Sequence, residues 1–238
     1  MIRFVGAGCG AADLITVRGM RLLRGCQAVV YDDLIDSALL DLAPESAERI
    51  YVGKRSGSHS AKQEEINGLL ISLARRGLSV VRLKGGDPYV FGRGGEEMAA
   101  LKAAGITCTE VPGITSAVAI PAEAGIPVTH RGLSRGVHIV TLHGSGDEAF
   151  LSGELKKLAP LGGTLVFLMG LSQLEDIAGG LIAEGKPSDT PAAVISGGNA
   201  KKICVRAPLC DIAETALRSG IEAPAVIVVG AAAALDVG

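Results

Sequence analysis

The sequence has no tryptophan, and aromatic residues make up only 3% of its 238 positions. Large flat side chains therefore cannot dominate the interior, although 48% of the residues are hydrophobic. Aliphatic residues, alanine and glycine must fill the core instead. Such small side chains suit helices that pack closely on sheets. The composition favours an α/β protein with a sizeable core.

Several other features are scarce or missing. The net charge of −2 provides no overall basic field, so a nucleic-acid partner is not expected and any anionic ligand must be held by local basic groups. No apolar run reaches the roughly 18–20 residues that cross a membrane. Five cysteines form no C-x-x-C pair, and no metal-binding histidine spacing occurs. With no visible targeting segment, an odd number of cysteines predicts reduced thiols in the cytoplasm.

Strand-like and helix-like segments alternate along the chain in two series. The first series has expected strands at 2–5, 27–31, 49–52, 79–83 and 106–111, and the second at 137–142, 164–168, 191–196, 203–207 and 224–229. The clearest helix has apolar residues at helical spacing from Ile66 to Leu73 and a stop at Gly77. Further helices are expected along the face from Leu171 to Leu181 and at about 208–219.

Two such series predict two α/β domains, each with a roughly five-stranded sheet and with a ligand cleft between them. Domains of 1–112 and 113–238 are expected, with the join inside the Pro-, Gly- and Thr-rich segment 112–136. Strand–helix alternation makes the first sheet mainly parallel. The short connection between 196 and 203 predicts an antiparallel pair, and hence a mixed sheet, in the second domain.

The segment 81–97 is the most informative part of the sequence. A β-branched strand breaks at Lys84-Gly85-Gly86-Asp87-Pro88, and Gly92-Arg93-Gly94-Gly95 leads into a helix opened by Glu96-Glu97. Glycine pairs let backbone approach a ligand, and loops at strand C-termini are where open α/β sheets bind ligands. An ordinary glycine-rich turn rarely interleaves so many charges.

A second glycine loop, Gly6-Ala7-Gly8-Cys9-Gly10-Ala11, follows the first strand. It fits G-x-G-x-x-A, and Asp32 ends the next strand. This arrangement approximates the fingerprint of a dinucleotide-binding fold, so an NAD-dependent dehydrogenase is one alternative. Any tight turn between strand and helix can need the same glycines.

Segment 81–97 and a succession of other blocks resemble the tetrapyrrole methylases, over nearly the whole chain and most densely before residue 131. The other blocks are, in order, 31–34 (YDDL), 52–55 (VGKR), 59–67 with His59-Ser60 and Gln63 to Asn67, 111–116 (VPGITS) and 122–130 (AEAGIPVTH). The resemblance implies methyl transfer from S-adenosyl-L-methionine, which leaves S-adenosyl-L-homocysteine, to C2 and C7 of uroporphyrinogen III. The product is precorrin-2, formed through precorrin-1, and it feeds sirohaem and cobalamin synthesis. The resemblance also implies a homodimer, to which the apolar run 226–235 adds a hint.

The resemblance assigns proton handling to Asp32 as acceptor and Lys54 as donor. Both residues follow strand ends, which places them at one edge of the sheet. The alternative is that Asp32 caps a helix and Lys54 is a solvated surface charge. Asp33 is a neighbouring competitor, at a position where the family varies.

The resemblance also implies contacts with the methyl donor, at Cys9, Gly85, Gly86, Asp87, Val90, Thr115, Ser116, Met169 and Gly198. By themselves, Thr115 and Ser116 would be interpreted as a helix N-cap, Met169 as a core residue and Gly198 as a turn glycine. In the first glycine loop this chain departs from the family, because Cys9 and Ala11 stand where Pro and Asp are usual. These departures keep a binding module without catalysis open as an alternative.

Uroporphyrinogen III is rich in carboxylates, which an arginine fork can grip. Arg93, flanked by glycines, is the main candidate, with Arg55 and His130 as further ones. Arg82 and Arg131 are also candidates, and for each residue other than Arg93 a solvated charge is the alternative. A sister methylase that acts on a later precorrin is a further alternative, although segment 84–97 looks specific to family members that use uroporphyrinogen III.

Overall fold

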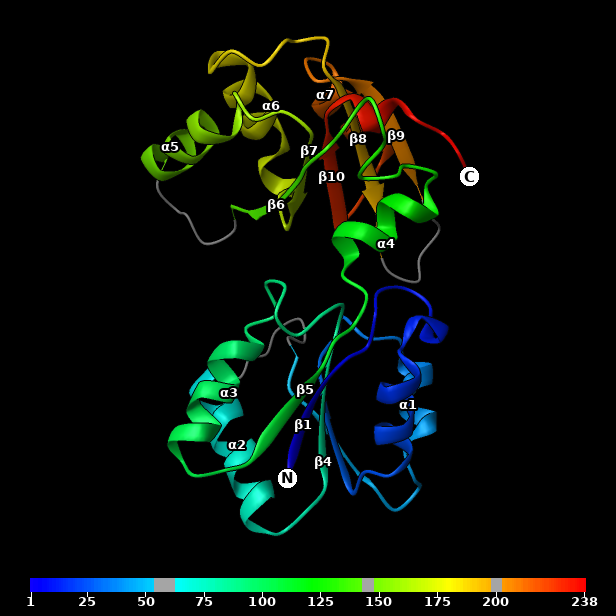
Figure 1. Cartoon of the computed structure of the whole chain (residues 1–238), viewed down its shortest axis with the longest axis vertical. Coiled ribbons are helices and arrows are strands. Elements are labelled where there is room, and N and C mark those ends of the chain that lie inside the picture. Colours follow the sequence, from blue (N-terminus) through cyan, green and yellow to red (C-terminus); the bar gives the residue numbers. More distant parts are fainter. Residues whose placement is uncertain (54–62, 143–147, 198–202) are drawn as a thin grey trace. The chain divides into compact units, whose positions relative to one another are not determined.

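The computed structural model describes residues 1–53, 63–142, 148–197 and 203–238. The chain divides into two compact units, Met1–Thr115 and Ser116–Gly238, which we name unit 1 and unit 2. Each unit contains a five-stranded sheet with helical segments on both faces (Figure 1). The predicted α/β class with two five-stranded sheets is confirmed.

The sheet of unit 1 is parallel in every strand pair. Its strand order is β3 (Glu48–Tyr51), β2 (Ala28–Tyr31), β4 (Val80–Lys84), β1 (Ile2–Gly6) and β5 (Cys108–Val111). Each strand reaches its partner through a long connection, as parallel pairing requires. All five carboxyl ends therefore meet at one edge of the sheet, which we name the carboxyl edge.

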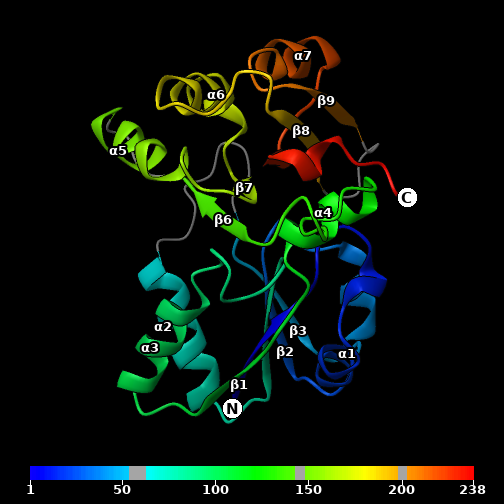
Figure 2. The ribbon, with the colours of Figure 1, turned by 45° about the horizontal axis from the view of Figure 1, so that its top comes forward.

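Helices cover the two faces of this sheet differently. Figure 2 shows α2 (Gln63–Arg75) and α3 (Gly94–Ala103) on one face and α1 (Val17–Arg24) on the other. The short 3-10 segments η1 (Ala12–Leu14) and η2 (Ser37–Leu42) pack on the α1 face. Along β4, Val80 faces α2 and α3 while Val81 faces α1, because side chains alternate along a strand.

The sheet of unit 2 is mixed. Its strand order is β6 (Val137–Thr141), β7 (Thr164–Leu168), β10 (Ala225–Val229), β8 (Pro191–Ser196) and β9 (Cys204–Pro208). Only β6 and β7 pair in parallel among these strands, and the other three pairs are antiparallel. The predicted antiparallel pairing of the strands on either side of 197–203 is confirmed.

Helices again lie on both faces of the unit 2 sheet. One face packs against α5 (Glu148–Leu158), α6 (Leu174–Ala183), which follows η3 (Leu171–Gln173), and α7 (Ile212–Ser219). The other face carries α4 (Ser116–Glu123) and η4 (Ala231–Ala234) (Figure 1). Within the described ranges, no helix combines the length and apolar character needed to cross a membrane.

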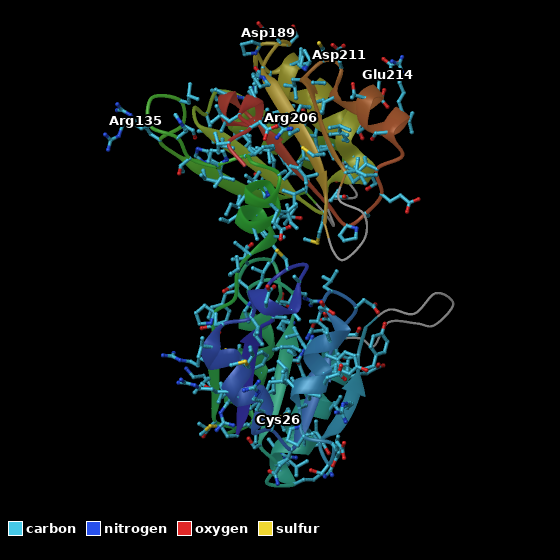
Figure 3. All side chains as sticks on the ribbon, turned by 90° about the vertical axis from the view of Figure 1, so that its right-hand side faces the viewer. Cys26, Arg135, Asp189, Arg206, Asp211 and Glu214 are labelled. Carbon is cyan, nitrogen blue, oxygen red and sulfur yellow. The ribbon has the colours of Figure 1, made fainter. Side chains whose placement is uncertain are left out.

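The apolar run 226–235 belongs to the core of unit 2. Its first part is β10, the central strand of the sheet, and both Ala232 and Ala233 are fully buried. The end of the run is held by Arg206 of β9, which Figure 3 labels. Its Nη2 donates to the carbonyl oxygens of Ala124 at 2.6 Å and Leu235 at 3.4 Å. Most side chains of this run are therefore used inside the unit, although Ala231 and Ala234 are exposed, and dimerisation stays a prediction.

Backbone hydrogen bonds join two loops at the carboxyl edge of unit 1. The Ala7 N–H donates to the Lys84 carbonyl at 2.8 Å, and Gly8 and Gly86 exchange bonds of 3.2 and 2.6 Å. These bonds continue the β1–β4 pairing past the strand ends and turn it into an isolated antiparallel bridge. The first glycine loop and the segment after β4 thus form one connected surface.

Glycine is required where a third loop meets these two. A β-carbon added to Gly113 would lie 2.7 Å from the Gly6 Cα and closer still to the Gly86 carbonyl oxygen. Both neighbours are backbone atoms, which cannot rotate away. Gly86 itself has a φ of 65°, a left-handed conformation that favours glycine. The loops after β1, β4 and β5 can therefore approach each other only without side chains.

The substitution Gly113→Ala is expected to destabilise unit 1 by about 1–3 kcal/mol, the usual cost of overpacking a close contact. Gly68→Ala is the matched control, since Gly68 lies within α2 and nothing surrounds its β-carbon position. Alanine in the middle of a helix should stabilise the control by about 0.5–1 kcal/mol. Urea unfolding followed by far-UV circular dichroism measures both. A Gly113→Ala protein as stable as its parent would contradict the close loop contact.

Candidate functional site

The carboxyl edge of unit 1 gathers the candidate residues that follow β1, β2 and β4. Cys9 comes after β1, Asp32 directly follows β2, and Gly85, Gly86 and Asp87 follow β4. The bonds between Gly8 and Gly86 place Cys9 next to the loop after β4. The strand directions thus bring these residues to one sheet edge, whereas the expected placement of Lys54 at the same edge stays a prediction because Lys54 lies outside the described residues.

Asp87 organises the backbone of this edge. One carboxylate oxygen accepts from the Tyr89 N–H at 2.8 Å and the other from the Gly113 N–H at 3.0 Å. The side chain therefore ties the loop after β4 to the loop after β5. Burial raises the pKa of the nearby Glu110 carboxyl, and the negative charge of Asp87 raises it further. Both oxygens of Asp87 thus accept backbone bonds that fix the side chain between the two loops.

Three residues outside glycine adopt left-handed backbone in the described part of the chain: Phe91, Arg93 and Met169, with φ of 54°, 59° and 57°. Such conformations are disfavoured for L-residues and concentrate at functional sites. Phe91 and Arg93 lie in the loop that leads to α3, and Met169 directly follows β7. Met169 is 48% exposed, which rules out the alternative that it is a core residue.

Arg93 lies just before α3 with its guanidinium turned to Glu96. Its Nε is 3.2 Å from both Glu96 carboxylate oxygens, and Nη2 donates to Oε2 at 2.7 Å. The arginine side chain is 55% exposed, so the pair is solvated. A carboxylate ligand that binds Arg93 would use its free Nη1 edge or compete with Glu96.

Three buried charged side chains lie behind Asp32, which joins their network as a partly exposed fourth member. Arg82 and Lys84 point from β4 toward the face covered by α3, and Glu97 of α3 meets both of them. The Arg82 Nε donates to Glu97 at 3.0 Å, and the Lys84 Nζ donates to the other Glu97 oxygen at 2.7 Å. Arg82 Nη2 reaches Asp32 at 3.3 Å. The network therefore runs from helix α3 to the end of β2.

The charges of this network are mutually compensated. Burial lowers the pKa of Lys84 and the neighbouring Arg82 lowers it further, while Glu97 offsets part of that effect. Burial alone would raise the pKa of Glu97, but Arg82 and Lys84 together outweigh burial, so this pKa lies below its ordinary value. The Glu97 carboxylate is accordingly bound by both cations, one at each oxygen.

Asp32 itself is not a helix cap. Its Oδ1 accepts from the Leu34 N–H at 3.2 Å, which closes a turn two residues on. The cap of the following 3-10 segment is Asp36, which accepts from the Ala38 N–H. Its neighbour Asp33 accepts from the Tyr51 hydroxyl at the end of β3. The alternative interpretation of Asp32 as a helix N-cap is wrong, and its carboxylate remains 23% exposed.

Glu97 and Lys84 were not expected at the site, and the expectation for Arg82 was wrong. Arg82 was expected to be solvated or to bind a substrate carboxylate, yet it is buried and bound to Glu97 and Asp32. A signal was present in the spacing. Val80, Arg82 and Lys84 alternate onto one strand face, and Glu97 is one helical turn from the buried Leu101. Two cations on a core face require an anion from the helix above.

The structure argues against the alternative that the first glycine loop binds a dinucleotide. After Gly10 the chain forms η1 and not an α-helix, and α1 begins only at Val17 with Thr16 as its cap. A pyrophosphate site needs the glycine loop to open directly into a helix N-terminus. Here the Gly8 peptide bonds instead to Gly86. Ala11, where the family usually has Asp, is exposed and makes no side-chain cap.

The remaining candidates have less defined surroundings. Thr115 is the last residue of unit 1, and Ser116 is the first of α4. His130 lies in an exposed turn of unit 2, where its Nδ1 is 2.9 Å from the Arg131 carbonyl oxygen. Lys54, Arg55 and Gly198 lie outside the described residues. Val90 closes the turn that starts at Asp87, with its N–H bound to the Asp87 carbonyl.

The other conspicuous features lie apart from these candidates within their units. A groove of about 380 Å³ runs between α5 and α6 in unit 2, with Glu175, Asp176 and Glu184 on its rim and no candidate residue in its lining. In unit 1, Cys26 lies before β2, at the end opposite to the carboxyl edge (Figure 3). Burial raises the pKa of the Cys26 thiol, which makes it a poor nucleophile.

Comparisons with known proteins identify the fold and the sequence pattern. The family model of the tetrapyrrole (corrin/porphyrin) methylases matches residues 1–212. A uroporphyrinogen-III C-methyltransferase of Methanocaldococcus jannaschii is 48% identical over 228 residues, which cover 95% of this chain and 93% of that protein. An S-adenosyl-L-methionine-dependent uroporphyrinogen III methyltransferase of Methanosarcina barkeri is 46% identical over 230 residues, covering 96% and 90%.

Solved structures agree with these relatives. The uroporphyrin-III C-methyltransferase of Thermus thermophilus, complexed with S-adenosyl homocysteine, superposes with a TM-score of 0.81 at 39% identity and covers 97% of each chain. The match spans both units and the carboxyl-edge loops lie within the family-model range. The chain belongs to the tetrapyrrole methylases.

Proposed function

We propose that this chain transfers methyl groups from S-adenosyl-L-methionine to C2 and C7 of uroporphyrinogen III, giving precorrin-2 through precorrin-1. The observation that carries the proposal is the 48% identity, over 95% of this chain, to the M. jannaschii methyltransferase of that name. A sister enzyme for a later precorrin is less favoured, because both relatives described above are named for uroporphyrinogen III.

The chemistry needs orientation more than strong acid–base help. An electron-rich pyrrole carbon donates its electron pair to the methyl carbon, and the carbon–sulfur bond breaks as the sulfonium becomes a neutral thioether. The positive charge now on the ring is relieved when the ring loses a proton. Holding the two reactants in line supplies most of the rate enhancement in such a transfer.

The methyl donor is proposed to contact the residues that the resemblance assigned. These are Cys9, Gly85, Gly86, Asp87, Val90, Thr115, Ser116, Met169 and Gly198. In unit 1 the connected loops after β1 and β4 support this, since they present peptide groups with little side-chain cover. Because the Asp87 carboxylate is already bound to Tyr89 and Gly113, its contribution is to hold the loop in shape for the donor.

Asp32 is proposed as the acceptor of the ring proton, with Lys54 as the donor that completes proton exchange. Asp32 is suited to this role because one side of its carboxylate is fixed by Arg82 while the group remains partly exposed. Arg93, with Arg55 and His130, is proposed to bind substrate carboxylates. A homodimer is also proposed, on the resemblance alone. The reducing cytoplasm is proposed as its compartment because all five cysteines are free.

The direct test is an anaerobic incubation of the purified protein with uroporphyrinogen III and S-adenosylmethionine. Mass spectrometry of the oxidised tetrapyrrole is expected to show the gain of two methyl groups, with a one-methyl species at early times. A protein that binds S-adenosylhomocysteine but leaves uroporphyrinogen III unmethylated would overturn the proposed reaction. Methylation of a later precorrin under the same conditions would then identify a sister enzyme.

Arg93→Ala is expected to raise the KM for uroporphyrinogen III by roughly 10-fold or more, on the scale of a lost charge-assisted hydrogen bond of about 1.5–3 kcal/mol. Binding of S-adenosylhomocysteine, measured by calorimetry, should change little. Arg218→Ala is the matched control, because Arg218 forms a similarly exposed pair with Glu214 on α7. Equal losses of substrate and donor binding in Arg93→Ala would contradict the assigned role.

A further inference from the structure

Arg82 connects helix α3 to the candidate proton acceptor. Its Nε donates to Glu97 on α3 at 3.0 Å, and its Nη2 donates to Asp32 after β2 at 3.3 Å. One planar guanidinium therefore spans two elements that are far apart in sequence. Any shift of α3 along the sheet is transmitted through this group to the Asp32 carboxylate.

The Arg82 side chain has little freedom to move. It is 3% exposed, and its Nη1 also donates to the carbonyl oxygens of Leu83 at 3.1 Å and Val30 at 3.4 Å. Its main anchor, Glu97, is 1% exposed and held from its other oxygen by Lys84. Every nitrogen of the fork has a partner, so the position of Nη2 is set from inside the unit.

Asp32 is consequently fixed on both oxygens. Oδ2 accepts from Arg82 and Oδ1 accepts from the Leu34 N–H, which leaves the remaining lone pairs in defined directions. A general base must present such a lone pair within hydrogen-bond reach of the proton that it removes. A carboxylate free to rotate would meet this condition only part of the time.

The charges of the network are balanced. Asp32 and Glu97 balance Arg82 and Lys84, and the exposed Arg93–Glu96 pair next to them is neutral as well. Because Glu97 also binds Arg82, the guanidinium is held by two carboxylates and not by Asp32 alone.

A purely structural role explains the network poorly. Buried ion pairs contribute little net stability, since the cost of removing charges from water offsets their attraction, and apolar residues of the same volume often do as well. Val80 on the same strand face shows that this face accepts apolar side chains. The charged residues on this face, Arg82 and Lys84, lie toward the carboxyl edge that carries Asp32.

We propose that Arg82, anchored by Glu97, is a positioning residue that sets the orientation of Asp32 for removal of the ring proton. The inference rests on the proposed function, and specifically on Asp32 as the proton acceptor. It adds that the acceptor is controlled by α3, through a side chain that touches neither substrate nor methyl donor.

The test is a double-mutant cycle of Arg82→Lys and Asp32→Asn, measured as kcat for methyl transfer to uroporphyrinogen III. Lysine keeps the charge at position 82 but has a single nitrogen, which cannot bridge Glu97 and Asp32 as the fork does. Arg82→Lys is expected to lower kcat roughly 10-fold to 100-fold, as misplacement of a reacting group does, with both KM values within about 3-fold. Asp32→Asn should lower kcat by roughly 100-fold or more, the scale of a lost general base.

The coupling between the two changes decides the role of Arg82. In the Asp32→Asn background, Arg82→Lys is expected to change kcat by less than about 2-fold, because the residue through which it acts is already lost. Arg76→Lys is the matched control, since Arg76 forms an exposed fork with Glu48 in the same unit and should leave kcat unchanged. The same loss in both backgrounds, or a rise in KM alone, would overturn the positioning role.

Two further outcomes separate this inference from the proposed function. An Asp32→Asn protein with full activity would reject Asp32 as acceptor, and an inactive parent protein would reject the reaction itself. If Arg82→Lys fails to fold, judged by its thermal melt and S-adenosylhomocysteine binding, the double replacement Arg82→Met with Glu97→Leu removes the buried pair as a unit. Lys84→Met is added to this replacement, because Lys84 would otherwise lose its anion Glu97 and stay buried as an unpaired cation. That protein, folded and with undiminished kcat, would also overturn the inference.

Discussion

The contact between Arg82 and Glu97 is the interaction on which the carboxyl edge of unit 1 depends. It joins the middle of the central strand β4 to the first turn of α3, inside the sheet–helix layer. Two further charges bind to this pair: Lys84 to Glu97, and Asp32 to Arg82. Removal of Glu97 would leave two cations buried side by side, which is the costliest way to break such a network.

In the loops that follow β1, β4 and β5, the residues expected to contact a ligand also hold the loops together. A β-carbon at Gly85 would collide with Leu34, and both carboxylate oxygens of Asp87 accept bonds from backbone N–H groups. Residues that look from sequence like direct ligand contacts thus serve first to bring three loops together. A shape held by backbone contacts keeps peptide groups in place for a ligand, which is how pre-organisation lowers the cost of binding.

Much of the fold was predictable because it depends on local patterns. The strand expected at 164–168 is β7 without change, and the short connection after Ser196 correctly indicated an antiparallel pair. The helix expected at about 208–219 begins only at Ile212, because Pro208 still belongs to β9 and the Leu209 and Cys210 N–H groups bond to Thr190 and Ser188. Boundaries set by such tertiary contacts leave little trace in sequence periodicity.

The site was predictable in part. Strand ends located Asp32 and the glycine loops, but the partner of Asp32 was not foreseen, since Arg82 resembled a surface charge. Its burial follows from the packing of α3 on β4, which no single segment encodes. The first part of the apolar run 226–235 is the central strand of the unit 2 sheet, which its hydrophobicity alone could not distinguish from an interaction surface.

The most direct measurement is the free energy of unfolding of the parent protein and of Glu97→Gln as a function of pH. The pKa of Glu97 is lowered in the folded protein, so its stabilisation is fully present above the unfolded value near 4.5 and is lost as pH falls through the folded value. We predict that Glu97→Gln is less stable by about 3–5 kcal/mol at pH 7, and that the difference shrinks at pH values below the unfolded pKa. A difference that is small at neutral pH, or that does not depend on pH, would contradict the account.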